Sequence, residues 1–491
     1  MDTNEENRKM YKSKVFSGLI WKFGERITAQ LISLIVSIIL ARLLSPSEYG
    51  AVALVMVFIT IANVFVSNGL GAALIQKKDA DQLDFSSVFY INILLSTILY
   101  LIIFFTAPII ADFYELSIMT PALRILGIRI IVAAINSVQQ AFVSRNLLFK
   151  RFFWSTLFGT VLSGVVGICL AYQGFGTWAL VVQYLTNTCT DTLVLWFTVK
   201  WRPILKCSLK RANSLISFGW KLLVSALLDT GYNQLRSLLI GKIYTKDDLA
   251  FYNQGDKFPS LIVTNINTSI SGVLFPVLSQ NQNDSERVKN MTRRAIQISS
   301  FIMWPMMIGF GVCAEPFVRL VLTEKWLSCV PYIRVFCFSY GLWPIHTANL
   351  QAINAMGRSD LFLKLEIIKK AMGLIIILVT LSHGPFIIAL GLALSGIVGT
   401  IINAWPNIRL LNYSYGEQMG DLIPSMLIAT IMGACIYPFT LLHLPDLFTL
   451  ILQIVMGIVV YYAIATITKQ NSLSYLSNTV LGHIKKGAKN K

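Results

Sequence analysis

Long apolar stretches recur along the whole chain, and short segments rich in charges and turn residues separate them. A helix of about 20 apolar residues, rising about 1.5 Å per residue, spans the hydrocarbon of a bilayer. Counted in this way, the pattern predicts about fourteen transmembrane helices. They are expected near 16–43, 49–75, 85–111, 121–144, 152–173, 175–199, 213–243, 256–280, 291–313, 330–356, 361–382, 385–411, 421–442 and 447–468. The sequence therefore predicts an all-α polytopic membrane protein.

The first stretch, residues 17–44, carries charges where a membrane helix is usually apolar. Lys22, Glu25 and Arg26 lie in its first half, and each charge at membrane depth costs about 2.5–3.5 kcal/mol. Steps of three and four residues place these charges and Ser33 on one stripe of a helix, with isoleucines and leucines on the other sides. We expect this stripe to face a wet interior.

A similar helix begins about 200 residues later, which indicates an internal repeat. Lys22 follows a tryptophan, and so does Lys221 in the later helix. The later helix also has a polar stripe, which includes Asp229 and Arg236. Membrane carriers are often built from two such repeats, with the substrate site where the repeats meet.

The repeat and the loop positions together predict the domain organisation. The expected parts are a cytoplasmic N-terminus (1–14), an N-terminal six-helix bundle (15–199), a cytoplasmic linker (200–212), a C-terminal six-helix bundle (213–411), a terminal helix pair (421–468) and a basic cytoplasmic tail (469–491).

Composition and charge agree with a membrane protein. Of the 491 residues, 55% are hydrophobic and 13% are charged, whereas soluble domains carry about 25% charged residues. The net charge of +17 resides in short loops, so anionic lipid headgroups, and not nucleic acid, are the expected partner. Lys and Arg gather in alternate loops, which places both termini in the cytoplasm by the positive-inside rule.

Motifs of enzymes and metal sites are missing from the sequence. There is no GxxxxGK[ST], HExxH or GxSxG pattern. The seven cysteines are scattered and form no CxxC, so they predict neither a metal site nor a disulfide framework. We expect a transporter without a cofactor.

Polar side chains also occur in the middle of other predicted spans, among them Arg129 and Asp191. The amides selected as candidate ligands are Asn63, Asn68, Gln140 and Asn267. The alternative for each amide is an interhelical hydrogen bond, worth about 0.6 kcal/mol on average.

The charged residues also have structural alternatives. Glu25 with Arg26, and Asp229 with Arg236, are candidates for structural ion pairs. Lys22 and Lys221 lie near helix ends, where a long side chain can reach the membrane interface. As ligands, cations on facing stripes suit an anion such as a pyrophosphate.

Three segments carry a family resemblance. They are GLIWKFGERITAQLISLIVSIILARLLSPSEYGAVAL (18–54), NGLGAALIQ (68–76) and QQA (139–141). They resemble the polysaccharide transporters of the multidrug/oligosaccharidyl-lipid/polysaccharide (MOP) exporter superfamily, and within it the Wzx-like flippases of O-antigen, colanic acid and exopolysaccharide.

The resemblance implies a MATE-like pair of bundles around a central cationic cavity. It implies a flippase that moves an oligosaccharide linked to undecaprenyl pyrophosphate across the bacterial plasma (inner) membrane, beside a polysaccharide polymerase and chain-length machinery. In this interpretation Lys22, Arg26, Lys221 and Arg236 hold the pyrophosphate and the four candidate amides contact sugar hydroxyls. Glu25 or Asp229 is a candidate for coupling to proton or sodium entry.

Two other functions compete with this interpretation. A drug or cation antiporter of the MATE type needs a cavity dominated by acidic groups, whereas the two stripes are mainly basic. A multi-span glycosyltransferase or polymerase predicts a long outer loop, and the outer loops here are no longer than about 15–20 residues.

Overall fold

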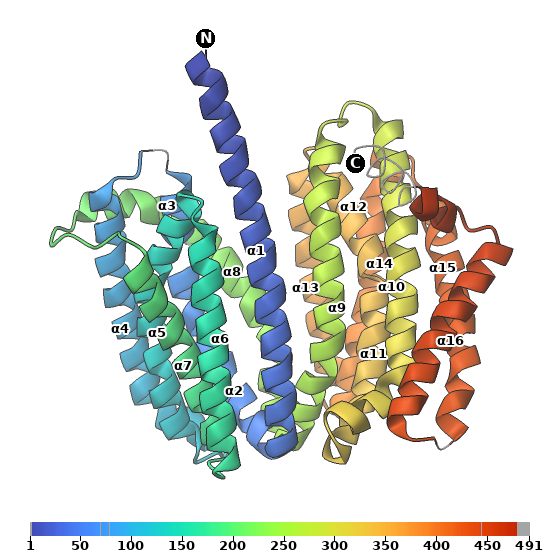
Figure 1. Ribbon diagram of the computed structural model, residues 1–491, viewed down its shortest axis with the longest axis horizontal. Helices are drawn as coiled ribbons and strands as arrows, with labels where there is room; N and C mark the ends of the chain where they lie inside the picture. Colours follow the sequence, from blue (N-terminus) through green and yellow to red (C-terminus); the bar gives the residue numbers. More distant parts are fainter. Residues whose placement is uncertain (1, 69, 78, 443, 479–491) are drawn as a thin grey trace. The chain divides into compact units, whose positions relative to one another are not determined.

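The computed structural model describes residues 2–68, 70–77, 79–442 and 444–478, and these residues form helices and connections without a β-strand (Figure 1). Their contacts divide the chain into two compact units, residues 1–250 and 251–491. The predicted all-α fold is therefore confirmed. The two units are described separately below.

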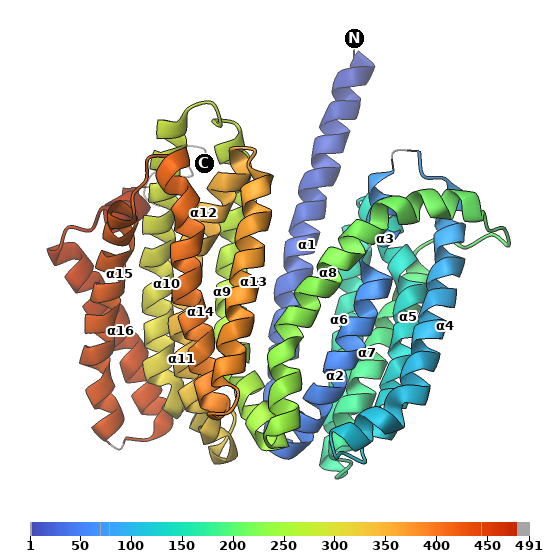
Figure 2. The ribbon, with the colours of Figure 1, turned by 180° about the vertical axis from the view of Figure 1, so that it is seen from behind.

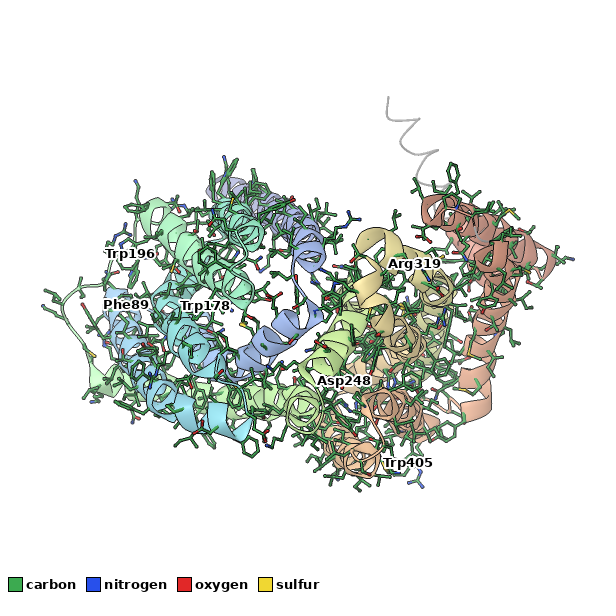
Figure 3. The ribbon with its side chains drawn as sticks, turned by 90° about the horizontal axis from the view of Figure 1, so that it is seen from below. Phe89, Trp178, Trp196, Asp248, Arg319 and Trp405 are labelled. Atoms are coloured by element: carbon green, nitrogen blue, oxygen red, sulfur yellow. The ribbon has the colours of Figure 1, made fainter. Side chains whose placement is uncertain are left out.

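The first unit contains eight helices in its described residues. They are α1 (Asp2–Leu43), α2 (Pro46–Ser67), α3 (Leu70–Gln76), α4 (Gln82–Phe113), α5 (Met119–Arg145), α6 (Phe149–Tyr172), α7 (Thr177–Thr198) and α8 (Leu209–Ile243). Helix α6 packs between α1 and α7, α4 packs along α5, and α2 lies against α5 and α8. An apolar cluster also brings α4 near α7, where the ring centroids of Phe89 and Trp196 are 6.0 Å apart (Figure 3).

The second unit begins within the next helix. Its elements are α9 (Lys246–Ser279), α10 (Ser285–Val321), the 3₁₀ helix η1 (Glu324–Cys329), α11 (Val330–Gly341), α12 (Trp343–Ala355), α13 (Ser359–Thr380), α14 (Pro385–Leu410), α15 (Tyr415–Ile436), the 3₁₀ helix η2 (Tyr437–Leu442) and α16 (Asp446–Ile467). Helix α10 contacts α11, α12, α15 and α16, so the terminal pair α15–α16 packs directly on it.

Each predicted span coincides with one helix or with two consecutive helices. The span 49–75 is interrupted between α2 and α3, and the span 330–356 is interrupted between α11 and α12. Ten helical segments in the described residues are long and apolar enough to cross a membrane. The chain is therefore a multi-pass membrane protein, and the count of fourteen stays a prediction.

Helix α8 belongs to the segment in which the sequence predicts a boundary between the two bundles. The sequence assigned 213–243 to the C-terminal bundle, after a linker at 200–212. In the structure α8 packs against α2, α3 and α4, and the unit boundary follows Ala250. A glycine permits this packing, since a Cβ at Gly241 would lie 2.7 Å from a methyl of Leu54 on α2. The repeat itself, and the bundle boundaries drawn from it, stay predictions.

The turn that connects α1 to α2 is fixed by a capping box. The Ser45 hydroxyl accepts a hydrogen bond from the backbone N–H of Glu48 (3.3 Å), and the Glu48 carboxylate accepts one from the Ser45 N–H (2.7 Å). Pro46 occupies the first helical position, where its missing N–H costs nothing. Thr245 and Asp248 make the same reciprocal pair at the start of α9 (3.1 and 3.2 Å). The two turns thus share local chemistry as well as sequence.

Within the second unit, an ion pair joins the terminal helix pair to α10. The Arg293 guanidinium of α10 donates two hydrogen bonds to Asp421 of α15, at 2.8 and 3.0 Å. Gln297 and the Tyr413 hydroxyl donate to the same carboxylate, at 2.6 and 2.7 Å. Because the Asp421 carboxylate is buried and accepts all four of these hydrogen bonds, the cluster holds α15 against α10.

Gly50 tests how closely the two capped turns approach each other. A Cβ at position 50 would lie 1.9 Å from the carbonyl oxygen of Lys246, and this backbone cannot move aside as a side-chain end can. We expect Gly50→Ala to lower the thermal unfolding temperature in detergent, with a loss of about 1–3 kcal/mol from overpacking. Gly24→Ala is the matched control, because nothing lies within 4 Å of a Cβ there and alanine favours a helix. Equal melting temperatures for the two variants would contradict the close approach.

Candidate functional site

A polar cavity of about 380 Å³ lies inside the first unit. Its walls come from α2, α3, α5 and α7. The polar side chains that line it are Asn63, Ser67, Arg129, Asn136, Ser137, Gln140, Ser144, Asn187, Thr188 and Asp191. Four amides, four hydroxyls, one cation and one anion thus face a single space between these helices.

Two charged groups of the cavity are held by neutral partners. The Arg129 guanidinium donates from Nε to the Thr188 hydroxyl (2.7 Å) and lies 5.9 Å from the centroid of the Tyr184 ring. The Asp191 carboxylate accepts a hydrogen bond from the Asn136 amide (2.6 Å). The carbonyl oxygen of the Asn136 side chain is buried and has no hydrogen-bond partner in the described residues. An added ligand can satisfy this acceptor by donating a hydroxyl hydrogen.

The α1 stripe lies close to this cavity on one side. Glu25 accepts a hydrogen bond from the Thr156 hydroxyl of α6 (3.1 Å) and interacts electrostatically with Asp191 and Lys22. The Lys22 side chain is exposed, with its Nζ 5.2 Å from the centroid of the Phe149 ring. Arg26 is half-buried on the same helix. Of the three predicted charges of α1, Glu25 is therefore the one that lies beside the cavity.

The α8 stripe is divided between exposed and buried groups. Lys221 and Asp229 are exposed, and the Asp229 carboxylate accepts a hydrogen bond from the Asn233 amide (3.3 Å). Arg236 is only 6% exposed, its guanidinium carbon lies 5.6 Å from the Tyr232 ring centroid, and its Nε has no hydrogen-bond partner. The three side chains predicted to share one wet face are thus in different environments.

Two of the four predicted amides meet in the cavity. Asn63 of α2 and Gln140 of α5 both line it. Asn68 is exposed just beyond α2 and donates to the hydroxyl of Ser67, itself a lining residue (3.2 Å). Asn267 lies in the second unit, where it accepts a hydrogen bond from the Thr347 hydroxyl. The roles of all ten predicted residues as ligands stay predictions.

Arg129, Asn136 and Asp191 were not selected as ligands from the sequence, although Arg129 and Asp191 were noted as charges inside apolar spans. The signal that could have identified Arg129 and Asp191 is the free-energy cost of a charge at membrane depth. The sequence analysis instead favours the stripes that occur in both repeats, because a single sequence does not reveal which polar stripes of different helices face one another.

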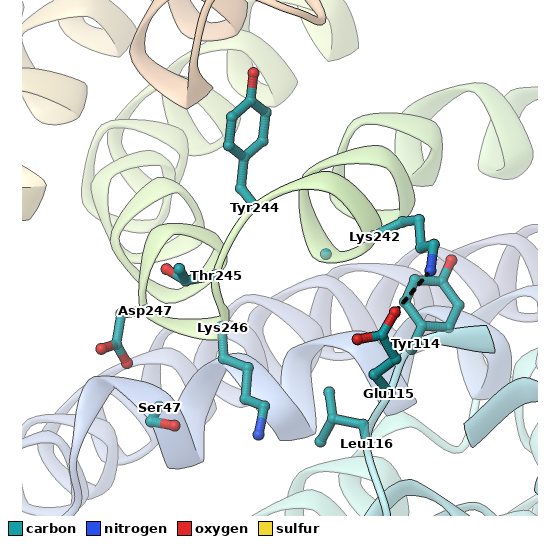
Figure 4. Close-up of a pocket in the computed structure, with 10 residues that line it drawn as sticks. Ser47, Tyr114, Glu115, Leu116, Lys242, Tyr244, Thr245, Lys246 and Asp247 are labelled. Atoms are coloured by element: carbon teal, nitrogen blue, oxygen red, sulfur yellow. Dashed lines mark ion pairs between the residues drawn. The ribbon is translucent and has the colours of Figure 1, made fainter. Parts of the chain in front are cut away.

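A second pocket, of about 320 Å³, lies at the opposite end of the first unit from the start of α1 (Figures 1 and 4). The Lys242 ammonium is 3.6 Å from the Glu115 carboxylate and donates to the carbonyl of Phe113 (2.6 Å). These contacts hold the end of α8 to the connection between α4 and α5. Asp247 also lines this pocket, but the described residues contain no group of three His, Cys, Asp or Glu side chains placed to bind a metal.

Arg129 provides a direct test of the cavity. We expect Arg129→Gln to weaken binding of an anionic ligand in the cavity about 10- to 100-fold, because a hydrogen bond to a charged group contributes about 1.5–3 kcal/mol. Arg124→Gln on the same helix is the matched control, since the Arg124 guanidinium packs on the Phe104 ring (4.3 Å) and donates to the carbonyl of Phe104 (3.3 Å). Ligand binding and membrane abundance are measured together. Equal binding by the two variants would show that the cavity does not take part.

Comparison with known proteins places this geometry in context. The family described as polysaccharide biosynthesis protein matches residues 39–331, more than half of the chain. The teichuronic acid biosynthesis protein TuaB of Bacillus subtilis (strain 168) is 23% identical over 424 residues, which cover 86% of this chain and 88% of TuaB. The lipopolysaccharide biosynthesis protein WzxC of Escherichia coli (strain K12) is 22% identical over 439 residues, which cover 86% of this chain and 88% of WzxC.

Solved structures show the same fold. The inward closed conformation of the lipid II flippase MurJ matches with a TM-score of 0.74 at 16% identity, over 93% of this chain and 100% of MurJ. An inward-facing multidrug resistance MATE family transporter of the MOP superfamily matches with a TM-score of 0.63 at 18% identity, over 78% of this chain and 94% of that chain. The predicted MATE-like fold is confirmed.

Proposed function

The chain belongs to the polysaccharide biosynthesis protein family, and from that premise we propose that it flips oligosaccharides linked to undecaprenyl pyrophosphate across the bacterial plasma membrane. In general terms it is a multi-pass transporter of the flippase type and not an enzyme. The identity of the lipid carrier, the direction from inner to outer leaflet and the mechanism belong to the proposal.

The polar cavity of the first unit is the observation on which the proposal rests. A sugar presents many hydroxyls, each of which donates and accepts hydrogen bonds. Asn63, Gln140 and the unsatisfied Asn136 oxygen offer complementary groups, and Arg129 offers a cation for a phosphate or an acidic sugar. The cavity volume, about 380 Å³, falls in the range of small-molecule sites.

The charged stripes of α1 and α8 hold the pyrophosphate in this mechanism. Lys22, Arg26, Lys221 and Arg236 supply charge-assisted hydrogen bonds to its oxygens. Asn68 and Asn267 contact further sugar hydroxyls, while the lipid tail stays in the bilayer. The protein then alternates between access from the two sides of the membrane, as carriers built from repeats do. Both termini lie in the cytoplasm, and polysaccharide polymerase and chain-length machinery act nearby.

A cation antiporter of the MATE type is the second candidate, and one observation favours it. The Glu25 and Asp191 carboxylates interact electrostatically across α1 and α7, and paired acids suit a cation. Arg129 lines the same cavity as Asp191, so a cationic drug would meet an opposing charge. The oligosaccharide proposal accounts for both the basic and the acidic groups, because the acids can serve ion coupling.

Arg26 tests the pyrophosphate-binding role. The protein is reconstituted in liposomes, and transfer of a lipid-linked oligosaccharide to the outer leaflet is measured. We expect Arg26→Gln to slow transfer about tenfold or more, because a cation–phosphate hydrogen bond is lost. Arg42→Gln on the same helix is the control, since Arg42 is exposed in the last turn of α1, and its transfer rate is expected within about twofold of the unmodified protein. Transport of cationic drugs without any transfer of the oligosaccharide would favour the antiporter instead.

Glu25 tests the proposed coupling to protons or sodium. Its bond to Thr156 and its interaction with Asp191 place it beside the cavity, whereas Asp229 is exposed. We therefore expect Glu25→Gln to abolish the response of oligosaccharide transfer to an imposed proton or sodium gradient. Glu115→Gln, which removes an exposed carboxylate at the far end of the unit, is expected to keep that response. Loss of the response in Asp229→Asn alone would reassign coupling to α8.

A further inference from the structure

Residues 199–210 comprise the connection between α7 and α8 and the first two residues of α8, and hydrogen bonds attach them to the first turns of α4. The backbone N–H of Ile204 donates to the Ser86 hydroxyl (3.0 Å), and that of Ser208 donates to the Ser87 hydroxyl (2.9 Å). Both serines are fully buried. The connection is therefore a fixed part of the surface of the first unit, which we call the connecting segment.

The connecting segment presents apolar and cationic side chains to its surroundings. Leu205 is 95% exposed and Leu209 is 74% exposed. Lys206 and Lys210 directly follow them and are exposed too. Figure 2 shows the first turns of α8 running across the end of α4, crosswise to the other helices of the unit. This orientation is the one a helix takes when it lies along a membrane interface.

The cations of this surface divide into paired and unpaired groups. Arg211 is 2.5 Å from the Asp81 carboxylate and holds the pKa of that carboxyl down, at about 2. Lys200, Lys206 and Lys210 are exposed and have no ion-pair partner in the part of the chain that the structure describes. Three positive charges thus stay uncompensated beside two exposed leucines.

We propose that the connecting segment is a docking surface for anionic phospholipid headgroups. Leu205 and Leu209 enter the boundary between headgroups and acyl chains, and the three lysines contact lipid phosphates. Long lysine side chains reach such phosphates while their stems cover apolar surface. An acidic protein would pair with the lysines, but its charge would not account for the two exposed leucines between them. The surface acts independently of the flipping proposed above.

Cys207 allows this docking to be measured, because it is exposed within the segment. The full chain carries a fluorophore on Cys207, with Cys169, Cys189 and Cys435 replaced by serine. The three buried cysteines are retained because they are shielded from the reagent, and Cys207→Ser measures residual labelling. The protein is reconstituted in phosphatidylcholine with a small fraction of either brominated phosphatidylglycerol or brominated phosphatidylcholine. Quenching by each brominated lipid reports its local abundance at the segment.

We expect brominated phosphatidylglycerol to quench at least about threefold more than brominated phosphatidylcholine at low salt. The triple variant Lys200→Gln, Lys206→Gln, Lys210→Gln is expected to remove this difference. A matched variant that replaces three other exposed lysines, Lys246, Lys364 and Lys469, by glutamine is expected to keep it. The variant Leu205→Ser, Leu209→Ser is expected to weaken quenching by both lipids and to preserve their ratio.

Equal quenching by the two lipids in the unmodified protein would overturn the proposal, and so would a preference that survives in the Lys200, Lys206, Lys210 variant. Absence of quenching by either lipid would show that the segment faces water or a protein, which also overturns it. Oligosaccharide transfer is measured on the same vesicles, so a failed flippase and a failed lipid contact are recognised separately.

Discussion

The interior of a bilayer offers no hydrogen-bond partners, and this constraint organises the structure. Every backbone N–H and C=O at membrane depth must be satisfied within the protein, which explains why the described spans are helical. Polar side chains obey the same rule, so they turn toward other helices and away from lipid. In the first unit the polar groups of α2, α5 and α7 converge in this way on one cavity. A polar cavity is thus a direct consequence of polar residues in apolar spans.

The same constraint acts at the ends of the helices, where backbone groups lose their partners within the helix. Capping boxes supply hydrogen-bond partners for the free backbone N–H groups at the starts of α2, α4 and α15. The paired residues are Ser45 with Glu48, Asp81 with Asp84, and Ser414 with Glu417. A capped end permits a short connection, and a glycine such as Gly50 then permits the close approach of a neighbouring turn. Local chemistry at the ends therefore determines how compactly each unit closes.

Hydropathy was sufficient to predict the helices, because length and apolarity decide whether a segment crosses a membrane. Hydropathy does not show against which helices a segment packs, as with α8, which lies on α2 through Gly241. Periodicity defined polar stripes on single helices, but not which stripes meet. It therefore placed Asn63 and Gln140 among the candidates without revealing that they share a cavity with Arg129, and it gave no sign that Arg236 is buried beside Tyr232.

Buried charges in this protein are stabilised in two ways. One way, a direct ion pair, holds two helices together, and the other, hydrogen bonds from neutral groups, occurs in the polar cavity. In the second unit Arg293 and Asp421 pair directly through two hydrogen bonds, so neither charge is available to another molecule. In the first unit Arg129 is held by a hydroxyl and Asp191 by an amide, and no direct ion pair joins them within the described residues. A dipole stabilises a charge without neutralising it. The cavity therefore keeps a cation and an anion that are not paired with each other, which fits the carrier proposed above, whereas the directly paired charges of Arg293 and Asp421 join α10 to α15.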